Sequence, residues 1–461
     1  MYAECGASLW SMSRLNLAVA VHGTGSGALS WKWPGTQWNR FNDFAFYRRS
    51  AEIARSGVID AVFVSDHPAL SRDAHRAPTH VFDPTVLFAA IAGAVPDIGF
   101  VLTASSTYSA PYDLARKLAS LDTISGGRVI WNVVANFNPD IAANFGSAPL
   151  PDRAERYRRA DEFIEVVKKL WLSWDTPTGD VPDGPLWDET TARTIDHHGD
   201  LFDVRGPLNV PVGPQGHPVI SQAGGSPRGI DLAARHAEIV YAAILSKAEA
   251  DTYRRRLAER AVVHGRSGGD IRLLPGLGVV LGDTTAEAYR RQEALEGAGD
   301  EDALVAQLLT RLRKNNPLLP ADVDADRPLR PEWFTSTDDQ GRPIGFTQAL
   351  HDVIAEEELT ARRLVRRVGP AGGHRVVVGT PREVADDIID WWSGGHVAGF
   401  NVHLPLLHED LDRFVTQVVP ILQAEGVYPT AYEEPTIRGR FGLPTPAPVS
   451  GGAALPDLAV G

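Results

Sequence analysis

Polar side chains follow each of the first four strand-like segments of the chain, where they could take part in binding or catalysis. These residues are His22, Asp66, Thr103 with Ser105, and Asn136. In parallel α/β folds the carboxyl ends of the strands share one face, and active sites collect there. Polar residues also end strands simply because they form turns. One such residue therefore means little, whereas four in equivalent positions favour a site.

A second set of residues could hold an anion. Arg153 and Tyr157 are four positions apart, so they share one face of a predicted helix. A cation in the first turn opposes the helix dipole, and a nearby anion would account for Arg153. Ser226 precedes Pro227 at another predicted helix start, where backbone N–H groups bind phosphate. A solvated arginine and an ordinary capped loop are the alternatives at these positions.

The run Gly23–Ala28 fits the pattern G-x-G-x-x-A of dinucleotide-binding turns. That turn requires a helix to begin at once, but the chain continues through Trp31, Trp33 and Pro34. Bulky residues and a proline at these positions disfavour such a helix. We therefore expect a loop at the mouth of the fold rather than a Rossmann turn.

The histidines do not indicate a metal site. His67, His75, His80, His197 and His198 show no ligand spacing such as H-E-x-x-H. We therefore expect no metal, and a metal-dependent barrel hydrolase is only a distant alternative.

Strand-like and helix-like segments alternate along the chain. Eight segments are predicted as strands: Leu15–Val21, Asp60–Val64, Ile98–Leu102, Arg128–Val134, Pro218–Gln222, Ile239–Ala243, Ile271–Leu281 and Gly399–Leu404. The clearest helix is Arg153–Trp174, whose apolar residues recur every three or four positions. Eight strands, each followed by a helix, predict an α/β chain folded as a (β/α)8 TIM barrel.

The domain organisation follows from the same pattern. Residues 14–427 are predicted to form the barrel, with an N-terminal extension at 1–13 and a C-terminal arm at 428–461. Two insertions, at about 175–217 and 286–379, interrupt the alternation. Long insertions are usually lids or binding loops, and we expect the second to act as a lid over the site.

Composition narrows the possible partners. The formal net charge is −13, and an acidic protein repels nucleic-acid phosphates and anionic membrane surfaces. No apolar run reaches the ~20 residues that span a bilayer, and the opening residues do not resemble a signal peptide. Cys5 is the single cysteine, so no disulfide can form within the chain. We therefore expect a cytoplasmic protein with no nucleic-acid or membrane partner.

Four stretches carry a family resemblance: PDRAERYRRADEFIEVVKKLWLSW; HHGDLFDVRGPLNVPVGPQGHPVISQAGGSPRGIDLAARHAEIVYAA; VVGTPREVADDIIDWW with GFNVHLP; and RFVTQVVPILQAEGVYP with TIRGRFGL. From about Leu15 to Leu443 the chain resembles the bacterial-luciferase-like flavin-dependent monooxygenases, within them the nitrilotriacetate monooxygenase component A group and related sulfone and sulfide monooxygenases. The resemblance implies a TIM barrel that binds FMN as FMNH2. It assigns the cofactor contacts to Asp66, Thr103 or Ser105, Arg153, Tyr157 and Ser226, with Asn136 beside the ring.

The resemblance also implies a reaction. FMNH2 from a separate NAD(P)H-dependent flavin reductase would react with O2 to a flavin hydroperoxide, which oxidises a small organic substrate. S-oxidation, or hydroxylation leading to C–N or C–S cleavage, is the expected outcome. His22 would be the catalytic polar group near the reacting oxygen. The enzyme is expected to be a homodimer or homotetramer.

One departure from the family affects the substrate. Many relatives carry a G-T-G-H-H-like run after the first strand, whereas this chain has Ser26 and Gly27 in place of the paired histidines. Smaller side chains would leave more room on the substrate side, so the resemblance does not name the substrate. Two alternatives stay open: an F420-dependent oxidoreductase of the same superfamily, and a flavin-binding barrel without catalysis.

Overall fold

The structure, a computed structural model, describes residues 14–27, 29–70, 82–136, 138–146, 149–174, 191–296, 301–313, 316–334, 345–369 and 373–446. These residues divide into two compact units. The described part of the first unit is 14–63 and 222–431, and that of the second is 64–70, 82–221 and 432–446. The predicted N-terminal extension and the last part of the predicted C-terminal arm lie outside the described residues.

The first unit is built on buried parallel strands. β1 (Asn16–Ala20) pairs with β2 (Ala61–Val64) on one side and with β12 (Gly399–His403) on the other. β12 also pairs with β10 (Gly276–Leu281), which pairs with β11 (Arg375–Gly379). β8 (Ile239–Val240) pairs with β9 (Arg272–Leu273), and the chain then enters β10.

One predicted strand of this unit is divided in two. The segment predicted at Ile271–Leu281 forms β9 and β10, with Leu274 and Pro275 between them. Proline lacks the N–H that a strand ladder needs. The division therefore has a local cause in the sequence.

Helices follow the strands of the first unit. They are α1 (Phe44–Ser56), α6 (Pro227–His236), α7 (Lys247–Val263), α8 (Thr285–Glu296), α9 (Glu301–Arg313), α10 (Gly345–Glu357), α11 (Ala361–Val368), α12 (Pro381–Ser393), α13 (Glu409–Arg413) and α14 (Val419–Ala424). Short 3-10 turns lie at Ser30–Lys32, Trp38–Arg40, Gly268–Asp270 and Pro331–Trp333, and a π-helical turn lies at Phe414–Val418. Side-chain caps define several starts, among them the capping box of Thr380 and Glu383 before α12.

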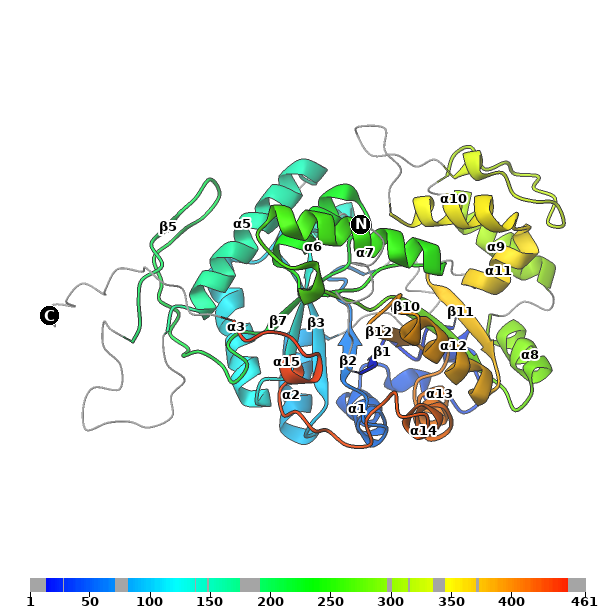
Figure 1. The fold of residues 1–461 in the computed structure, drawn as a ribbon, viewed down its shortest axis with the longest axis horizontal. Helices are drawn as coiled ribbons and strands as arrows, with labels where there is room; N and C mark the ends of the chain where they lie inside the picture. Colours follow the sequence, from blue (N-terminus) through cyan, green and yellow to red (C-terminus); the bar gives the residue numbers. More distant parts are fainter. Residues whose placement is uncertain are drawn as a thin grey trace, which may run out of the picture. The chain divides into compact units, whose positions relative to one another are not determined.

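The insertion predicted at 286–379 contains a hydrophobic cluster of its own. Helices α9, α10 and α11 lie together (Figure 1) and bury Leu308, Leu350 and Leu364 among them. Leu245, which follows β8, belongs to the same cluster, and Arg367 donates a hydrogen bond to its carbonyl oxygen at 2.8 Å. Much of the insertion is thus a packed helical assembly within the first unit, whereas its last residues, Arg375–Gly379, form β11 of the sheet.

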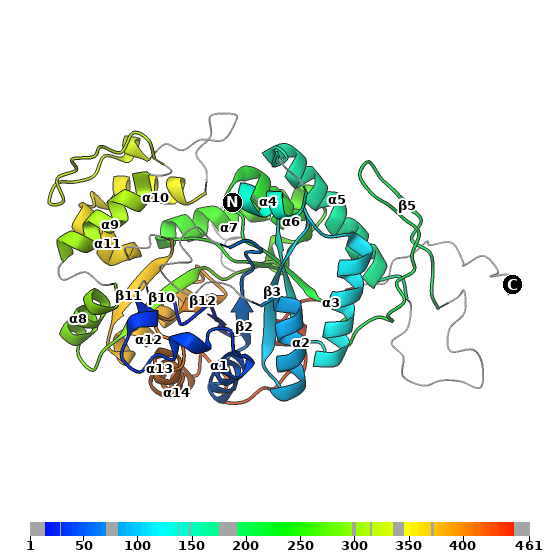
Figure 2. The same cartoon turned by 180° about the vertical axis from the view of Figure 1, so that it is seen from behind.

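The second unit carries β3 (Gly99–Ser105), β4 (Val129–Val134) and β7 (Val219–Gln222) in that order. Its helices are α2 (Pro84–Ala94), α3 (Pro111–Ser125), α4 (Pro139–Asn144), α5 (Arg153–Trp171) and α15 (Ile437–Arg440). β3 and β4 are parallel and in register from Phe100 opposite Val129. Helix α2 lies beside β3 and α3 (Figure 2), and α3 packs against α5.

Helix α5 is shorter than the predicted Arg153–Trp174. It ends at Trp171, where Ser173 donates a hydrogen bond to the carbonyl of Leu170 at 2.7 Å and accepts one from Leu208 N at 3.1 Å. A serine that bonds locally to the backbone favours the end of a helix over its continuation. Hydrophobic periodicity alone therefore overextended this helix by three residues.

Two further segments are fastened to the second unit. The hairpin of β5 (His197–His198) and β6 (Asp203–Val204) is held by Glu162 of α5, whose carboxylate accepts hydrogen bonds from Leu201 N and Phe202 N at 3.1 and 2.9 Å. In the described part of the C-terminal arm, buried Arg438 donates a hydrogen bond to the carbonyl of Gln215 at 2.9 Å. Both contacts use charged side chains to satisfy backbone groups.

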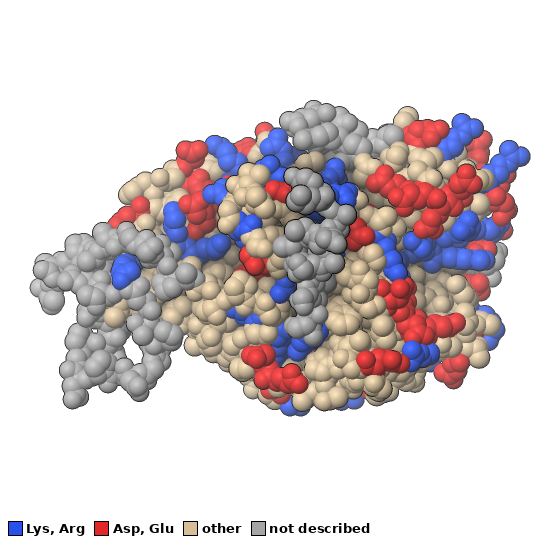
Figure 3. All heavy atoms as spheres, in the orientation of Figure 1, with Lys and Arg blue, Asp and Glu red and all other residues tan. Residues whose placement is uncertain are grey.

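The predicted α/β class and (β/α)8 arrangement are confirmed. Each of the eight predicted strand regions contains a strand, and the pairs named above are parallel except β5 with β6. Among the described residues, no helix combines the length and apolar character needed to traverse a lipid bilayer. On the face drawn in Figure 3, acidic and basic side chains are interspersed over the described residues.

Candidate functional site

Three histidines of the first unit bring their rings together; we call them the histidine cluster. His22 follows β1, His403 ends β12, and His374 precedes β11. The ring centroids of His403 and His374 are 4.6 Å apart in a stacked arrangement, and those of His403 and His22 are 6.4 Å apart. The strand register brings them together. Gly278 of β10 is paired with His403 of β12 on one side and with Val376 of β11, two residues after His374, on the other.

Two members of the histidine cluster, His374 and His403, are uncharged at neutral pH. Burial lowers the pKa of His374 to about 4. Burial, and then the neighbouring His374 and His22, lower the pKa of His403 well below its usual range. Asn401 Nδ2 lies 3.3 Å from His403 Nε2, within hydrogen-bond distance. His374 and His403 therefore offer neutral hydrogen-bonding groups rather than cations.

The glycine-rich run after β1 is a loop held against the segment that follows β12. Ser26 N and Gly27 N donate hydrogen bonds to the carbonyls of Leu404 and Pro405 at 2.9 and 3.2 Å. Gly25 has a φ of 132°, and a Cβ on it would lie 2.0 Å from the Pro405 carbonyl oxygen. The next helical element is only the 3-10 turn at Ser30–Lys32. The expected loop is confirmed, and no dinucleotide-binding helix starts here.

A cavity of about 250 Å³ lies beside this loop within the first unit. Its polar lining consists of Ser26, Gln292, Glu296, Arg311, His374 and His403, and β10 contributes Gly278, Val279 and Val280. Ser26, one of the two residues that depart from the family pattern, thus faces a cavity. We call this the β10 cavity.

A second, larger cavity of the first unit adjoins the start of helix α6. It measures about 450 Å³ and is lined in part by Gly225, Pro227 and Tyr253. Ser226, predicted to hold a phosphate, caps the helix by accepting a hydrogen bond from Gly229 N at 3.2 Å. Tyr253 Oη donates to the Gly224 carbonyl at 2.7 Å, which fixes the loop. We call this the α6 cavity.

Charged side chains also line the α6 cavity. They are Glu249, Arg256, Asp352 and Glu356. Burial raises the pKa of Glu249 to about 7, helped by the charges of Asp352 and Glu356. Lower pH therefore removes a negative charge from this cavity in the physiological range.

In the second unit, polar groups lie toward the carboxyl ends of β3 and β4 and just after them. Thr103 Oγ1 accepts a hydrogen bond from Asn132 Nδ2 at 3.0 Å, and both side chains are buried. Ser105 Oγ accepts from Tyr108 N at 3.2 Å, so it shapes the turn after β3. Among the described residues, the buried Oδ1 atoms of Asn132 and Asn136 have no hydrogen-bond partner. Such atoms are costly unless a ligand or water satisfies them.

The first turns of α5 lie next to the turn after β3. Arg159 donates to the carbonyls of Thr107 and Ser109 at 3.1 and 3.3 Å. Arg153 and Tyr157 are half-buried on this part of the helix, and Arg156 between them has a lowered pKa, mainly through burial. The predicted anion-binding pair thus sits in a cationic, partly desolvated part of the second unit.

Asp66, also in the second unit, follows β2. Burial and the nearby charge of Asp83 raise the pKa of the Asp66 carboxyl to about 6. Asp83 caps α2 by accepting a hydrogen bond from Thr85 N at 2.8 Å. Asp66 can therefore exist as a neutral hydrogen-bond donor under mildly acidic conditions.

The structure groups the predicted residues by unit. His22 and Ser226 belong to the first unit, and the second unit holds the others: Asp66, Thr103, Ser105, Asn136, Arg153 and Tyr157. Sequence reasoning missed His403 and His374. His403 had a weak signal, because it lies near the end of the eighth predicted strand, Gly399–Leu404. His374 had none, because it lies in an insertion.

Comparison with known proteins gives the same family throughout. Residues 22–396 match the family described as luciferase-like monooxygenase. The chain is 36% identical to nitrilotriacetate monooxygenase component A of Aminobacter aminovorans, and 32% identical to N-acetyl-S-(2-succino)cysteine monooxygenase of Bacillus subtilis (strain 168). Each alignment covers 94% of this chain and 97% of the relative. The structure of EDTA monooxygenase from Chelativorans sp. BNC1 is similar, with a TM-score of 0.80, 40% identity, and coverage of 94% of this chain and 99% of that chain.

Proposed function

Since this chain belongs to the luciferase-like monooxygenase family, we propose that it oxidises a small organic molecule with O2 and reduced FMN, which a separate NAD(P)H-dependent flavin reductase supplies. Nitrilotriacetate monooxygenase component A, 36% identical, is by its name one component of a larger system, which supports a separate reductase. When bound, reduced flavin supplies the electrons that put one oxygen atom into the substrate and release the other as water.

The α6 cavity is the observation that best supports a phosphorylated flavin. The start of a helix offers backbone N–H groups and a positive dipole end to an anion, and this cavity opens on the start of α6. Ser226 at the cap and Arg256 in the lining would hold the phosphate. Glu249 opposes a phosphate when ionised, and its raised pKa lessens that opposition near neutral pH.

The second unit contains the other residues that the family resemblance assigns to the flavin. Asn136 Oδ1 and Asn132 Oδ1 are buried acceptors without partners among the described residues, and an N–H or O–H of the cofactor would satisfy them. Arg153 and Tyr157 on α5 would bind an anionic or ring-edge group. Asp66 and Thr103 would orient the ring or the ribityl chain.

We assign a role in the reaction to His22 of the histidine cluster. Its neighbours His374 and His403 are neutral imidazoles, which can donate or accept a hydrogen bond without a fixed charge. We assign His22 as a polar group near the reacting oxygen, with the ring of His403 beside it at 6.4 Å. Buried rings around it, such as Phe63 at 6.1 Å, exclude water.

Anaerobic titration with reduced FMN tests the proposal. We expect binding in the micromolar range, with oxidised FMN and F420 weaker. Addition of O2, a flavin reductase and NADH with a substrate should then consume oxygen. Equal affinity for reduced and oxidised FMN would defeat the proposal, and tight F420 binding with hydride transfer but no oxygen uptake would favour the F420-dependent alternative.

A further inference from the structure

The β10 cavity carries one arginine among its described lining residues, Arg311. We propose that this cavity binds the substrate and that Arg311 holds a carboxylate group of it, so that the substrate is a small organic acid. This inference rests on the proposed function, because it assigns the substrate class of the same enzyme.

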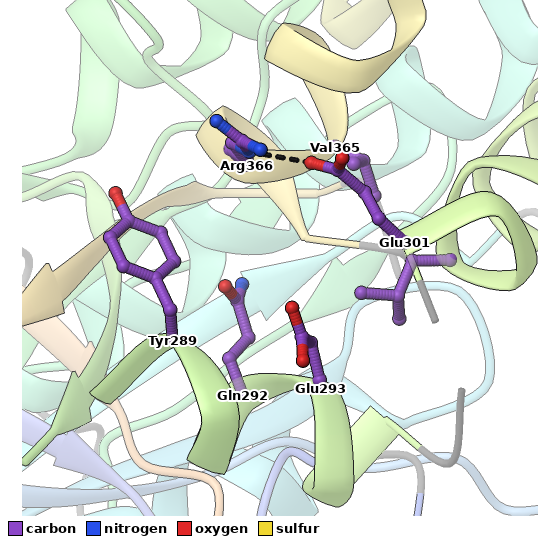
Figure 4. Close-up of a pocket in the computed structure, with 7 residues that line it drawn as sticks. Tyr289, Gln292, Glu293, Glu301, Val365 and Arg366 are labelled. Carbon is purple, nitrogen blue, oxygen red and sulfur yellow. Dashed lines mark hydrogen bonds and ion pairs between the residues drawn. The ribbon is translucent and has the colours of Figure 1, made fainter. Parts of the chain in front are cut away.

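Arg311 has no acidic partner among the described residues, whereas two arginines of α11 are held in ion pairs. Arg362 forms ion pairs with Asp302 and Asp326 at 2.6 and 2.7 Å. Arg366 pairs with Glu301 at 2.6 Å (Figure 4). The charges of Arg362 and Arg366 are balanced by carboxylates of the protein, whereas the charge of Arg311 is available to bind an anionic ligand.

The protein atoms around Arg311 affect the pKa of its guanidinium group. Protein atoms around the guanidinium lower its pKa by desolvation, and no acidic group counteracts the effect. A guanidinium nevertheless stays charged at any physiological pH. Arg311 is exposed as a residue, and a carboxylate, which accepts two hydrogen bonds at once, matches the planar geometry of its guanidinium group.

The other ionisable groups of the β10 cavity limit the shape of the ligand. His374 and His403 are uncharged, as argued above, and Glu296 of α8 is the one acidic side chain of the described lining. A ligand carboxylate therefore belongs on the α9 side at Arg311. The side facing Glu296 suits a neutral or N–H-bearing part of the molecule.

The volume of the β10 cavity also favours a small substrate. At about 250 Å³, the β10 cavity falls below the range of roughly 300–1,000 Å³ common for drug-sized ligands. Buried Gln292 lines it and also lines a neighbouring cavity of about 160 Å³, where it stands beside Tyr289 and Glu293 on α8 (Figure 4). A small acid fits the first cavity, and the second offers room for an extension past Gln292.

The names of two relatives are consistent with a carboxylate ligand. These relatives are named for nitrilotriacetate and for N-acetyl-S-(2-succino)cysteine, and both compounds carry several carboxylates. This agreement selects the probes for a test and does not replace it.

Isothermal titration calorimetry on the full-length chain, with and without FMN, is the test. The probes are nitrilotriacetate and N-acetyl-S-(2-succino)cysteine, each compared with its methyl ester, which has the same skeleton without the charges. We expect at least one acid to bind tenfold or more tightly than its ester. Arg311→Gln should abolish that preference, and Arg311→Lys should restore part of it.

Arg363→Gln is the matched control, because Arg363 is an exposed arginine of α11 that does not line the β10 cavity. It should keep the full preference for the acid. If neither acid binds better than its ester, or if Arg311→Gln keeps the preference, the proposal is overturned. Reduced-FMN titration of the same proteins is a separate measurement, so a failure of the proposed function is distinguishable from a failure of this one.

Discussion

The imidazole of His403 stacks on that of His374, with ring centroids 4.6 Å apart and ring planes 30° apart. The two residues are brought together by the stagger of β12 and β11 on either side of β10. Each ring takes the place of water that would otherwise solvate the other ring. This loss of solvation disfavours the charged imidazolium, so both imidazoles stay neutral. Because these rings resist protonation in the folded state, they should lower the free energy of unfolding at low pH.

His374 should make the protein less stable as the pH falls. Its pKa is lowered to about 4 in the folded state from a usual 6.5, so between these values the unfolded chain binds more protons. The free energy of unfolding therefore rises with pH through this window, by on the order of 3 kcal/mol. Denaturant unfolding from pH 4 to 7 measures it, and His374→Phe should flatten the curve. An unchanged slope in that variant would show that His374 is not responsible.

Asp122 should act in the opposite direction. Burial raises the pKa of the Asp122 carboxyl to about 7, although hydrogen bonds from Gln215 and Val129 and the charge of Arg438 lower it. The folded state then binds more protons than the unfolded state above the usual pKa, so stability falls as the pH rises toward 7. We expect a loss of roughly 4 kcal/mol between pH 4 and 8.

Asp122→Asn separates this effect from the rest of the protein. The amide oxygen can keep the hydrogen bond from Gln215 Nε2, which is 2.6 Å from Asp122 Oδ1, while no charge remains to be buried. The variant should lose this part of the pH dependence and be the more stable protein at pH 8. Parallel stability curves for the two proteins would contradict the raised pKa.

Arg153 should matter for flavin affinity rather than for the rate of chemistry. Arg153→Ala is expected to weaken reduced-FMN binding at least tenfold, since a charge-assisted hydrogen bond is worth about 1.5–3 kcal/mol. The rate of oxidation at saturating flavin should change less. Arg158→Ala is the control, because Arg158 is on the same helix with an exposed side chain, 3.8 Å from Asp200. Unaltered flavin affinity in Arg153→Ala would remove this residue from the site.

Glu249 should make flavin binding depend on pH. Its pKa is raised to about 7, so it is mostly neutral at pH 6 and mostly ionised at pH 8. The ionised carboxylate repels a phosphate in the α6 cavity, and the dissociation constant of FMN should rise several-fold from pH 6 to 8. Fluorescence titration measures this, with Glu249→Gln as the comparison. The phosphate titrates alike with both proteins, so equal pH profiles would exclude a phosphate beside Glu249.

Local chemistry made many elements predictable. The start of α5 at Arg153 follows its cap Asp152, which accepts a hydrogen bond from Glu155 N at 2.8 Å. Each of the eight predicted strand regions likewise contains a strand. Errors came where a nearby side chain or backbone constraint overrode periodicity, as at Ser173 and Pro275.

The sequence by itself determined the order of strands and helices, the family, and the polar residues that follow the strands, because caps, turns and hydrophobic spacing act over a few residues. Only the tertiary structure decided which of these side chains meet. His22, His374 and His403 are far apart in the chain, and their contact depends on strand stagger. Arg311 reaches the β10 cavity because an inserted helical assembly packs on Leu245. Such long-range packing leaves no local pattern in the sequence from which it can be read.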